Sequence, residues 1–90
     1  MLYSNRSGAL AASGSFSAAL SDAERCIALD PTWGKGYTRK AAALHGLKRY
    51  LVAVQAYDEA LEREPEGSGR EALLVGRRQS SFGLMIEDLA

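Results

Sequence analysis

The sequence has few cysteines, prolines and histidines. It has one cysteine, Cys26, two prolines and one histidine among 90 residues. A lone cysteine cannot form an internal disulfide, which suits a reducing compartment. Basic and acidic side chains are equal in number, 11 of each, so net charge gives no attraction to nucleic acid or to an acidic membrane. Apolar runs such as residues 41–44 are far shorter than the ~20 residues that span a bilayer, and the start is unlike a signal peptide. We expect one small cytoplasmic domain without nucleic-acid or membrane partners.

Groups that carry catalysis are also scarce. His45 and Cys26 are single, and Cys26 lies on an apolar stripe where a packing role is expected. No cluster has the spacing of metal ligands. The Gly34-x-Gly36 and Gly67-x-Gly69 pairs lack the preceding strand that phosphate-binding loops need. We therefore expect no catalytic residue, metal or cofactor, and a protein that is not an enzyme.

The chain repeats itself with a period of about 34 residues. The aligned pairs include Tyr3 with Tyr37, Ala9 with Ala43, Leu10 with Leu44 and Pro31 with Pro65. Apolar residues in each unit recur at spacings of three and four, which is one face of an α-helix, and none alternates as in a strand. They are Phe16, Ala19, Leu20, Ala23, Cys26 and Ile27, and then Tyr50, Ala53, Val54, Tyr57, Ala60 and Leu61. The pattern predicts an all-α fold in which a two-helix unit occurs twice.

Glycines and prolines set the expected helix ends. The expected helices cover residues 2–12, 16–29, from 32 or 33 to 46–48, 49–63, and about 68–79. The last of these is a C-terminal capping helix, and residues 80–83 form a weak point before a short helix at 84–89. We expect a repeat domain over residues 1–79, with repeats at 1–31 and 32–65, and a separate tail at 80–90.

The period, two helices per unit and closing prolines resemble the tetratricopeptide repeat. The resemblance covers residues 2–65. It implies a helical-hairpin solenoid of two repeats plus a cap, whose first helices line a concave groove and whose second helices form the convex back.

Residues 2–7 and 33–44 resemble the chaperone-binding repeats of the stress-inducible phosphoprotein or Hsp-organising co-chaperone family, in particular its first repeat domain. The resemblance implies a co-chaperone adaptor that binds the C-terminal Glu-Glu-Val-Asp tails of cytosolic seventy- and ninety-kilodalton heat-shock chaperones. It implies a carboxylate clamp made by Asn5, Lys35 and Arg39. In the family, an earlier repeat supplies a further lysine and asparagine, and this chain is expected to be a fragment that begins at the second repeat.

The residues support such a site independently of the name. Asn5 and Arg39 are one full repeat period apart and hold equivalent places on successive first helices, while Lys35 and Arg39 share one helix face. Cations and an amide can bind a terminal carboxylate by charge-assisted hydrogen bonds. The candidate groove residues are Gly8, Ala42, His45 and Gly46. Two alternatives stay open: the cations can be a solvated face, and Asn5 can bond to nearby backbone.

Two other functions are compatible with the sequence. The repeats can serve as a structural assembly module, or they can belong to a larger prolyl isomerase or phosphatase, since similar repeats are fused to both. We also expect self-association, because the first helix should expose apolar groups near Leu2 and Leu10. The expected partner surface is either the first repeat of another copy or the apolar tail of a neighbouring copy, with Leu51-Val52 as a further contact. The tail residues are Phe82, Leu84, Met85, Ile86 and Leu89.

Overall fold

The computed structural model describes residues 2–64 and 68–89. These residues form five helices and no strand, which confirms the all-α prediction. The helices are α1 Leu2–Ala12, α2 Phe16–Leu29, α3 Gly34–Gly46, α4 Tyr50–Arg63 and α5 Ser68–Leu89. The bounds of α1 and α2 are those predicted, whereas α3 begins one or two residues later than expected and α4 one residue later. No helix in this part of the chain is long and apolar enough to cross a membrane.

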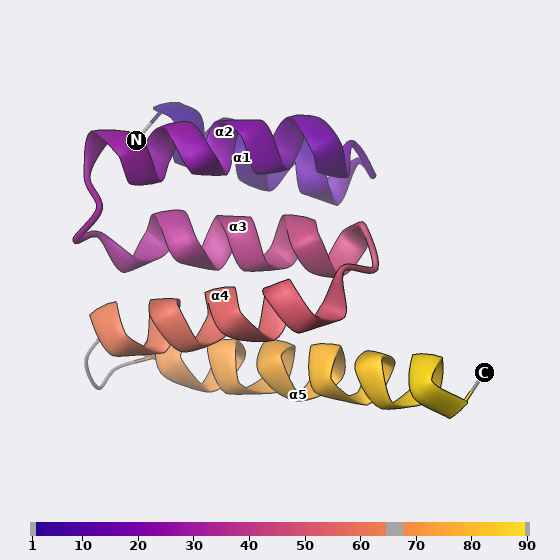
Figure 1. Cartoon of the computed structure of the whole chain (residues 1–90). Helices are drawn as coiled ribbons and strands as arrows, with labels where there is room; N and C mark the ends of the chain where they lie inside the picture. The colour runs from indigo at the N-terminus through magenta and orange to yellow at the C-terminus, as the bar shows by residue number, and fades with distance from the viewer. Residues whose placement is uncertain (1, 65–67, 90) are drawn as a thin grey trace.

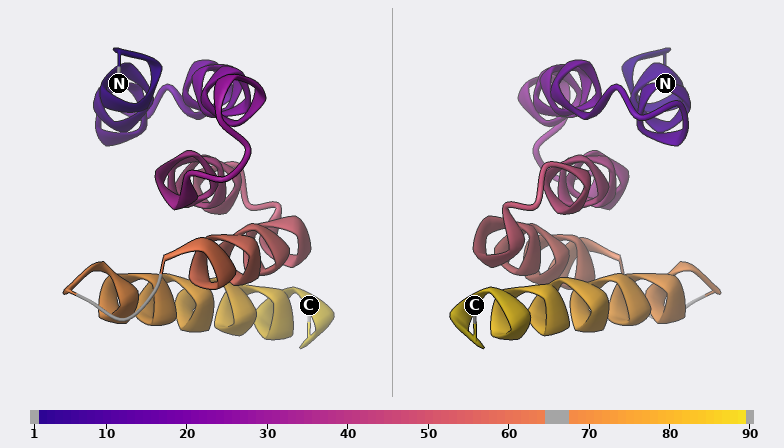
Figure 2. Two further views of the ribbon diagram at one scale, coloured as in Figure 1. Left: turned by 90° about the vertical axis from the view of Figure 1, so that its left-hand side faces the viewer. Right: turned by 90° about the vertical axis from the view of Figure 1, so that its right-hand side faces the viewer.

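The helices stack in chain order as two antiparallel hairpins followed by a single helix (Figure 1). Each helix packs against the next, and α3 also contacts α1 and α5. Seen along the hairpins, α1 to α4 appear nearly end-on, whereas the longer α5 lies across the view at the outer edge of the stack (Figure 2). The first helix of each unit therefore adjoins the first helix of the next, as in a tetratricopeptide-repeat solenoid.

Equivalent turns close the first helix of each unit. Gly14 and Lys48 occupy the same place in successive repeats, and both have positive φ angles, 87° and 61°. The next amide in each turn, that of Ser15 or Arg49, donates to a carbonyl five residues earlier, at 2.8 and 2.9 Å. Glycine adopts this conformation without strain, whereas lysine does so at a cost. The second turn is therefore the more strained of the two.

The main apolar cluster lies in the second hairpin and α5, and Ala19, Ala23 and Cys26 of α2 are buried as well. Its buried members come from α3, α4 and α5, and half of them are alanines that let the helices approach closely. They are Tyr37, Ala41, Leu44, Ala53, Ala56, Tyr57, Ala60 and Leu73. The ring of Tyr57 fills the place where a side chain on Gly76 would stand, since a Cβ there would lie 2.6 Å from the ring. The cap thus adds both a leucine and a close helix contact to the core.

The predicted break at residues 80–83 is wrong, because α5 continues through them to Leu89. Ser80 is fully buried, and its Oγ lies 2.7 Å from Nδ1 of His45. A Cβ on Gly83 would lie 2.8 Å from the ring of Tyr50, so this glycine allows close contact with α4. The small residues that predicted a break are therefore the ones through which α5 contacts α3 and α4. The predicted repeat end at Pro65 lies outside the described residues.

Candidate functional site

Arg39 extends from α3 to the surface of α1. Its Nε donates to Oγ of Ser4 at 3.4 Å. Its guanidinium lies over Gly8, where an added Cβ would be 3.0 Å from Cζ. Ser4 and Gly8 are one helical turn apart, so they form one face of α1. Gly8, a predicted groove residue, therefore leaves space for the arginine head.

The other two predicted clamp residues, Asn5 and Lys35, are placed by their positions on α1 and α3. Asn5 follows Ser4 directly on α1 and is exposed, and Lys35 precedes Arg39 by one turn on α3 and is also exposed. Arg39 itself is half-buried. The structure thus places the predicted clamp residues on adjoining helices, with the arginine spanning the gap between them.

Lys35 and Arg39 of α3 form no ion pair with an acidic residue in the described parts of the chain, unlike three arginines elsewhere. Within residues 2–64 and 68–89, ion pairs join Arg6 to Asp22, Arg63 to Glu62 and Arg77 to Asp58. None of them involves Lys35 or Arg39. Because the Nε of Arg39 is already engaged by a neutral hydroxyl, the Nη groups keep their charge and donors for an external anion.

A groove of about 420 Å³ runs between α3 and α5. Lys35, Thr38 and Ala42 line its α3 side, Tyr57 of α4 contributes to it, and Glu64, Gly69, Ala72 and Leu73 complete it. Burial raises the pKa of Tyr57, so its hydroxyl stays neutral at physiological pH. Small residues on both sides leave room for an extended backbone. Glu64 places one negative charge in the same groove as Lys35.

Two predicted groove residues serve a different purpose. His45 bonds to Ser80 of α5, and its ring meets that of Tyr50 edge-on with centroids 5.4 Å apart. The space beside Gly46 is filled by the ring of Phe16 from α2. Neither residue lines the groove between α3 and α5. Both join helices to each other, because the end of α3 is where three neighbours meet it.

The residues that sequence reasoning missed are mostly small and polar. Ser7 is buried, and its Oγ donates to the carbonyl of Ala19 at 2.7 Å. Ser4, also buried, accepts from Arg39. A usable signal existed, since Ser4 and Ser7 are three residues apart on the face that α1 turns toward its neighbours. Serines on a buried stripe indicate hydrogen bonds to backbone or side chains.

A fork-shaped ion pair joins α1 to α2. The Nε and Nη2 of Arg6 donate to the two carboxylate oxygens of Asp22 at 2.6 and 2.8 Å. The hydrogen bonds and charge of Arg6 lower the pKa of Asp22, and those of Asp22 raise the pKa of Arg6. Asp22 is only 4% exposed. This pair therefore holds the helix on which Asn5 is carried.

The described residues contain no group of three or more histidine, cysteine, aspartate or glutamate side chains that could hold a metal ion. The arrangement contains cations, an amide and a groove, groups that can make charge-assisted hydrogen bonds to an anion.

The stacked helical hairpins define the chain as a tetratricopeptide-repeat protein, although no protein-family model matches it. It is similar to several longer proteins. An Hsp70-Hsp90 organizing protein of Triticum aestivum is 42% identical over 81 residues, which is 90% of this chain and 14% of that protein. A heat shock protein sti1 homolog of Schizosaccharomyces pombe is 47% identical over 87 residues, 92% of this chain and 15% of that protein.

An Hsp70-Hsp90 organising protein of Plasmodium falciparum is 42% identical over 82 residues, 91% of this chain and 32% of that protein. The chain is thus similar to one stretch of the Hsp70-Hsp90 organising proteins, and it spans between about one seventh and one third of the length of these relatives.

Proposed function

We propose that this chain is a co-chaperone adaptor domain that binds acidic C-terminal peptides of the Glu-Glu-Val-Asp type through a carboxylate clamp. The ligands are the C-terminal tails of cytosolic seventy- and ninety-kilodalton heat-shock chaperones, met in the cytoplasm. The names of the relatives support chaperone partners. The observation that carries the proposal is the placement of Arg39, whose guanidinium lies against Ser4 and Gly8 of α1, the helix that carries Asn5, with no carboxylate partner among the described residues.

The clamp works by complementing two adjacent anions. The last residue of such a peptide carries an α-carboxylate and an Asp side chain. The Nη groups of Arg39 form a planar fork that fits one carboxylate, while Lys35 supplies a compact positive charge for the other. The amide of Asn5 adds a neutral donor. No covalent bond forms or breaks, so the chain needs no catalytic group.

Preorganisation makes this arrangement effective. Ser4 fixes the Nε of Arg39, and Gly8 leaves room for the rest of the head. Less side-chain entropy is then lost when the peptide binds. The groove between α3 and α5 receives the preceding peptide residues, whose backbone passes small residues such as Ala42 and Ala72. With few charged contacts and a shallow groove, the expected affinity is micromolar and falls as salt concentration rises.

The proposal is tested by calorimetric titration with a peptide that ends in Glu-Glu-Val-Asp. Replacing Arg39→Ala or Lys35→Ala removes a charge-assisted hydrogen bond of about 1.5–3 kcal/mol, so each variant should bind roughly ten to a hundred times more weakly. Helicity should not change, because neither side chain belongs to the apolar core.

Arg49→Ala is the matched control, since it removes an exposed positive charge from the turn between α3 and α4. It should bind like the wild type. If the Arg39→Ala, Lys35→Ala double variant binds as tightly as the control, the carboxylate clamp is not the binding mechanism.

A further inference from the structure

Helix α5 carries an apolar stripe that no other described element covers. Its core side presents buried residues to α3 and α4, namely Leu73, Gly76 and Ser80. On the opposite side, exposed apolar residues follow the helix, and Phe82 is 57% exposed. They are Leu74, Val75, Phe82, Met85 and Ile86. Because α5 is the last layer of the stack, this side faces outward (Figure 2).

The stripe has a symmetry that can be counted along the sequence. Arg78 and Phe82 lie two residues before and after position 80. Val75 and Met85 lie five residues from it, and Leu74 and Ile86 lie six residues from it. A two-fold interface between identical chains needs a patch that is complementary to itself. A second α5, running antiparallel and centred on the same position, places each member of a pair opposite its counterpart.

The charge pattern favours this antiparallel register. Arg78 takes part in no ion pair within the described residues, whereas Arg77 is paired with Asp58 of α4 at 2.6 Å. In the antiparallel register, each Arg78 faces the aromatic ring of Phe82 in the other copy, and a guanidinium over a ring is an attractive arrangement. A parallel register would instead place the two Arg78 side chains opposite each other, where like charges repel.

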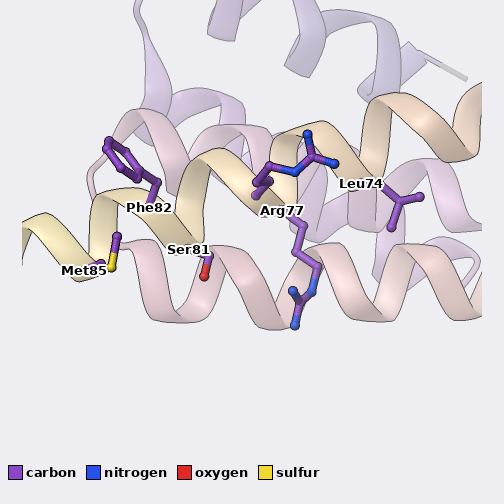
Figure 3. A pocket seen from close by; sticks show the side chains of 6 residues that line it. Leu74, Arg77, Ser81, Phe82 and Met85 are labelled. Carbon is purple, nitrogen blue, oxygen red and sulfur yellow. The ribbon is translucent and has the colours of Figure 1, made fainter.

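Cavities on both sides of Phe82 provide space for the partner's side chains. One, of about 470 Å³, has Leu74 at one end and Phe82 and Met85 at the other (Figure 3). The other, of about 620 Å³, is lined mainly by apolar and aromatic groups, including Tyr50 and Ile86. Arg78 and Phe82 line both cavities. A ridge with a hollow on each side fits the same surface of a second helix.

We propose that a second copy of this chain docks on this stripe, forming an antiparallel α5 pair about a two-fold axis that lies level with residue 80 on the exposed side of the helix. The exposed parts of the five apolar side chains amount to roughly 500 Å² per copy, so a pair buries about 1,000 Å², near the lower limit of a specific interface. The dimer is therefore weak, with a dissociation constant on the order of 10–100 μM. The clamp residues lie on α1 and α3 and remain free in it.

Disulfide cross-linking tests the register directly. In a Cys26→Ala background, which introduces the residue found at the equivalent Ala60, two variants are made, Leu74→Cys and Ile86→Cys. In the antiparallel pair, position 74 of one copy faces position 86 of the other. The two copies of position 74 are separated by about 18 Å along the axis, too far for a disulfide. Mixing the two variants under mild oxidation should give a heterodimer, and neither variant alone should cross-link to itself.

Cross-linking of each variant to itself in preference to the mixed product would overturn the register. Sedimentation equilibrium of the uncross-linked chain up to several hundred micromolar tests the pair itself. Phe82→Ala and Arg78→Glu should each weaken dimerisation at least tenfold, whereas Leu51→Ala, which removes a side chain of equal exposure, 57%, from α4, should not. A wild-type chain that stays monomeric, or a Leu51→Ala variant as impaired as Phe82→Ala, would overturn the proposal.

Discussion

The two helical hairpins repeat the same sequence pattern but are held together by different forces. In the first hairpin, the buried residues of α1 are two serines, and the link to α2 includes the Arg6–Asp22 pair and the bond from Ser7 to the carbonyl of Ala19. In the second hairpin, Tyr37, Leu44 and Tyr57 form an apolar core that continues into α5. Burial of apolar surface dominates stability. The second hairpin with its cap therefore contains the larger buried apolar cluster, whereas α1 buries only serines and is joined to α2 by polar contacts as well as by the buried Ala19, Ala23 and Cys26 of α2.

The candidate clamp crosses this boundary. Lys35 and Arg39 stand on the apolar-cored half, whereas Asn5 stands on the polar half. A ligand that contacts both halves binds the folded arrangement of α1 and stabilises it. Hydrogen exchange in α1 should accordingly be faster than in α3 and should slow when the acidic peptide is added.

The largest expected effect comes from equivalent leucines in the two hairpins. Leu44 is 4% exposed in the core, whereas Leu10, its counterpart in the first repeat, is only partly buried. Leu44→Ala should cost about 2–5 kcal/mol in the free energy of unfolding, through lost burial and a residual cavity. Leu10→Ala should cost less than about half as much. Urea unfolding monitored by circular dichroism measures both, and equal losses would show that the hairpins do not differ in this way.

The next effect is a pH dependence confined to the first hairpin. The folded-state pKa of Asp22 is lowered by Arg6. A lowered pKa contributes stability that is present above the unfolded-state value of about 4 and is lost as pH falls through the folded-state value. Asp22→Asn should therefore melt below the wild type at pH 7, and the gap should shrink as the pH falls below about 4.

The control is the more exposed pair of Asp58 with Arg77, whose side chains are 48% and 42% exposed. Exposed pairs contribute about 0–1 kcal/mol. Asp58→Asn should therefore change the melting temperature little at any pH. A wild-type advantage over Asp22→Asn that is the same at pH 3 and pH 7 would exclude the ion pair as its cause.

The smallest effect sharpens the comparison of the turns. Lys48→Gly removes a lysine from the left-handed region and should raise the free energy of unfolding by about 0.5–1 kcal/mol. Gly14→Ala, at the equivalent turn of the first hairpin, should lower it by a similar amount. Nothing lies within 4 Å of a Cβ added at Gly14, so only the backbone conformation is tested. Chemical denaturation resolves both changes, and equal signs would contradict the assignment of strain.

The repeat period and the apolar spacing made four helices predictable to within one or two residues, because periodicity reports directly on which face is buried. The continuity of α5 was not predictable, because serine and glycine at positions 80 and 83 are typical of a helix end. Only the folded structure shows that they allow close contact with α3 and α4. Likewise, Gly46 predicted open space, but the ring of Phe16 from another helix fills it. Asn5, Lys35 and Arg39 were identifiable as candidates from repeat spacing and resemblance. The hydroxyl of Ser4 that holds Arg39 depends on the stacking of α1 on α3.

The central claim is that Arg39, braced across two helices, binds a terminal carboxylate. A thermodynamic cycle tests it by titrating the acidic peptide, with free and with amidated C-terminus, into the wild type and Arg39→Ala. Amidation removes one of two anions, so it should weaken binding to the wild type about tenfold or more. It should weaken binding to Arg39→Ala much less, because the group that reads that anion is already absent. Equal affinity of the wild type for the free and amidated peptides would contradict the claim.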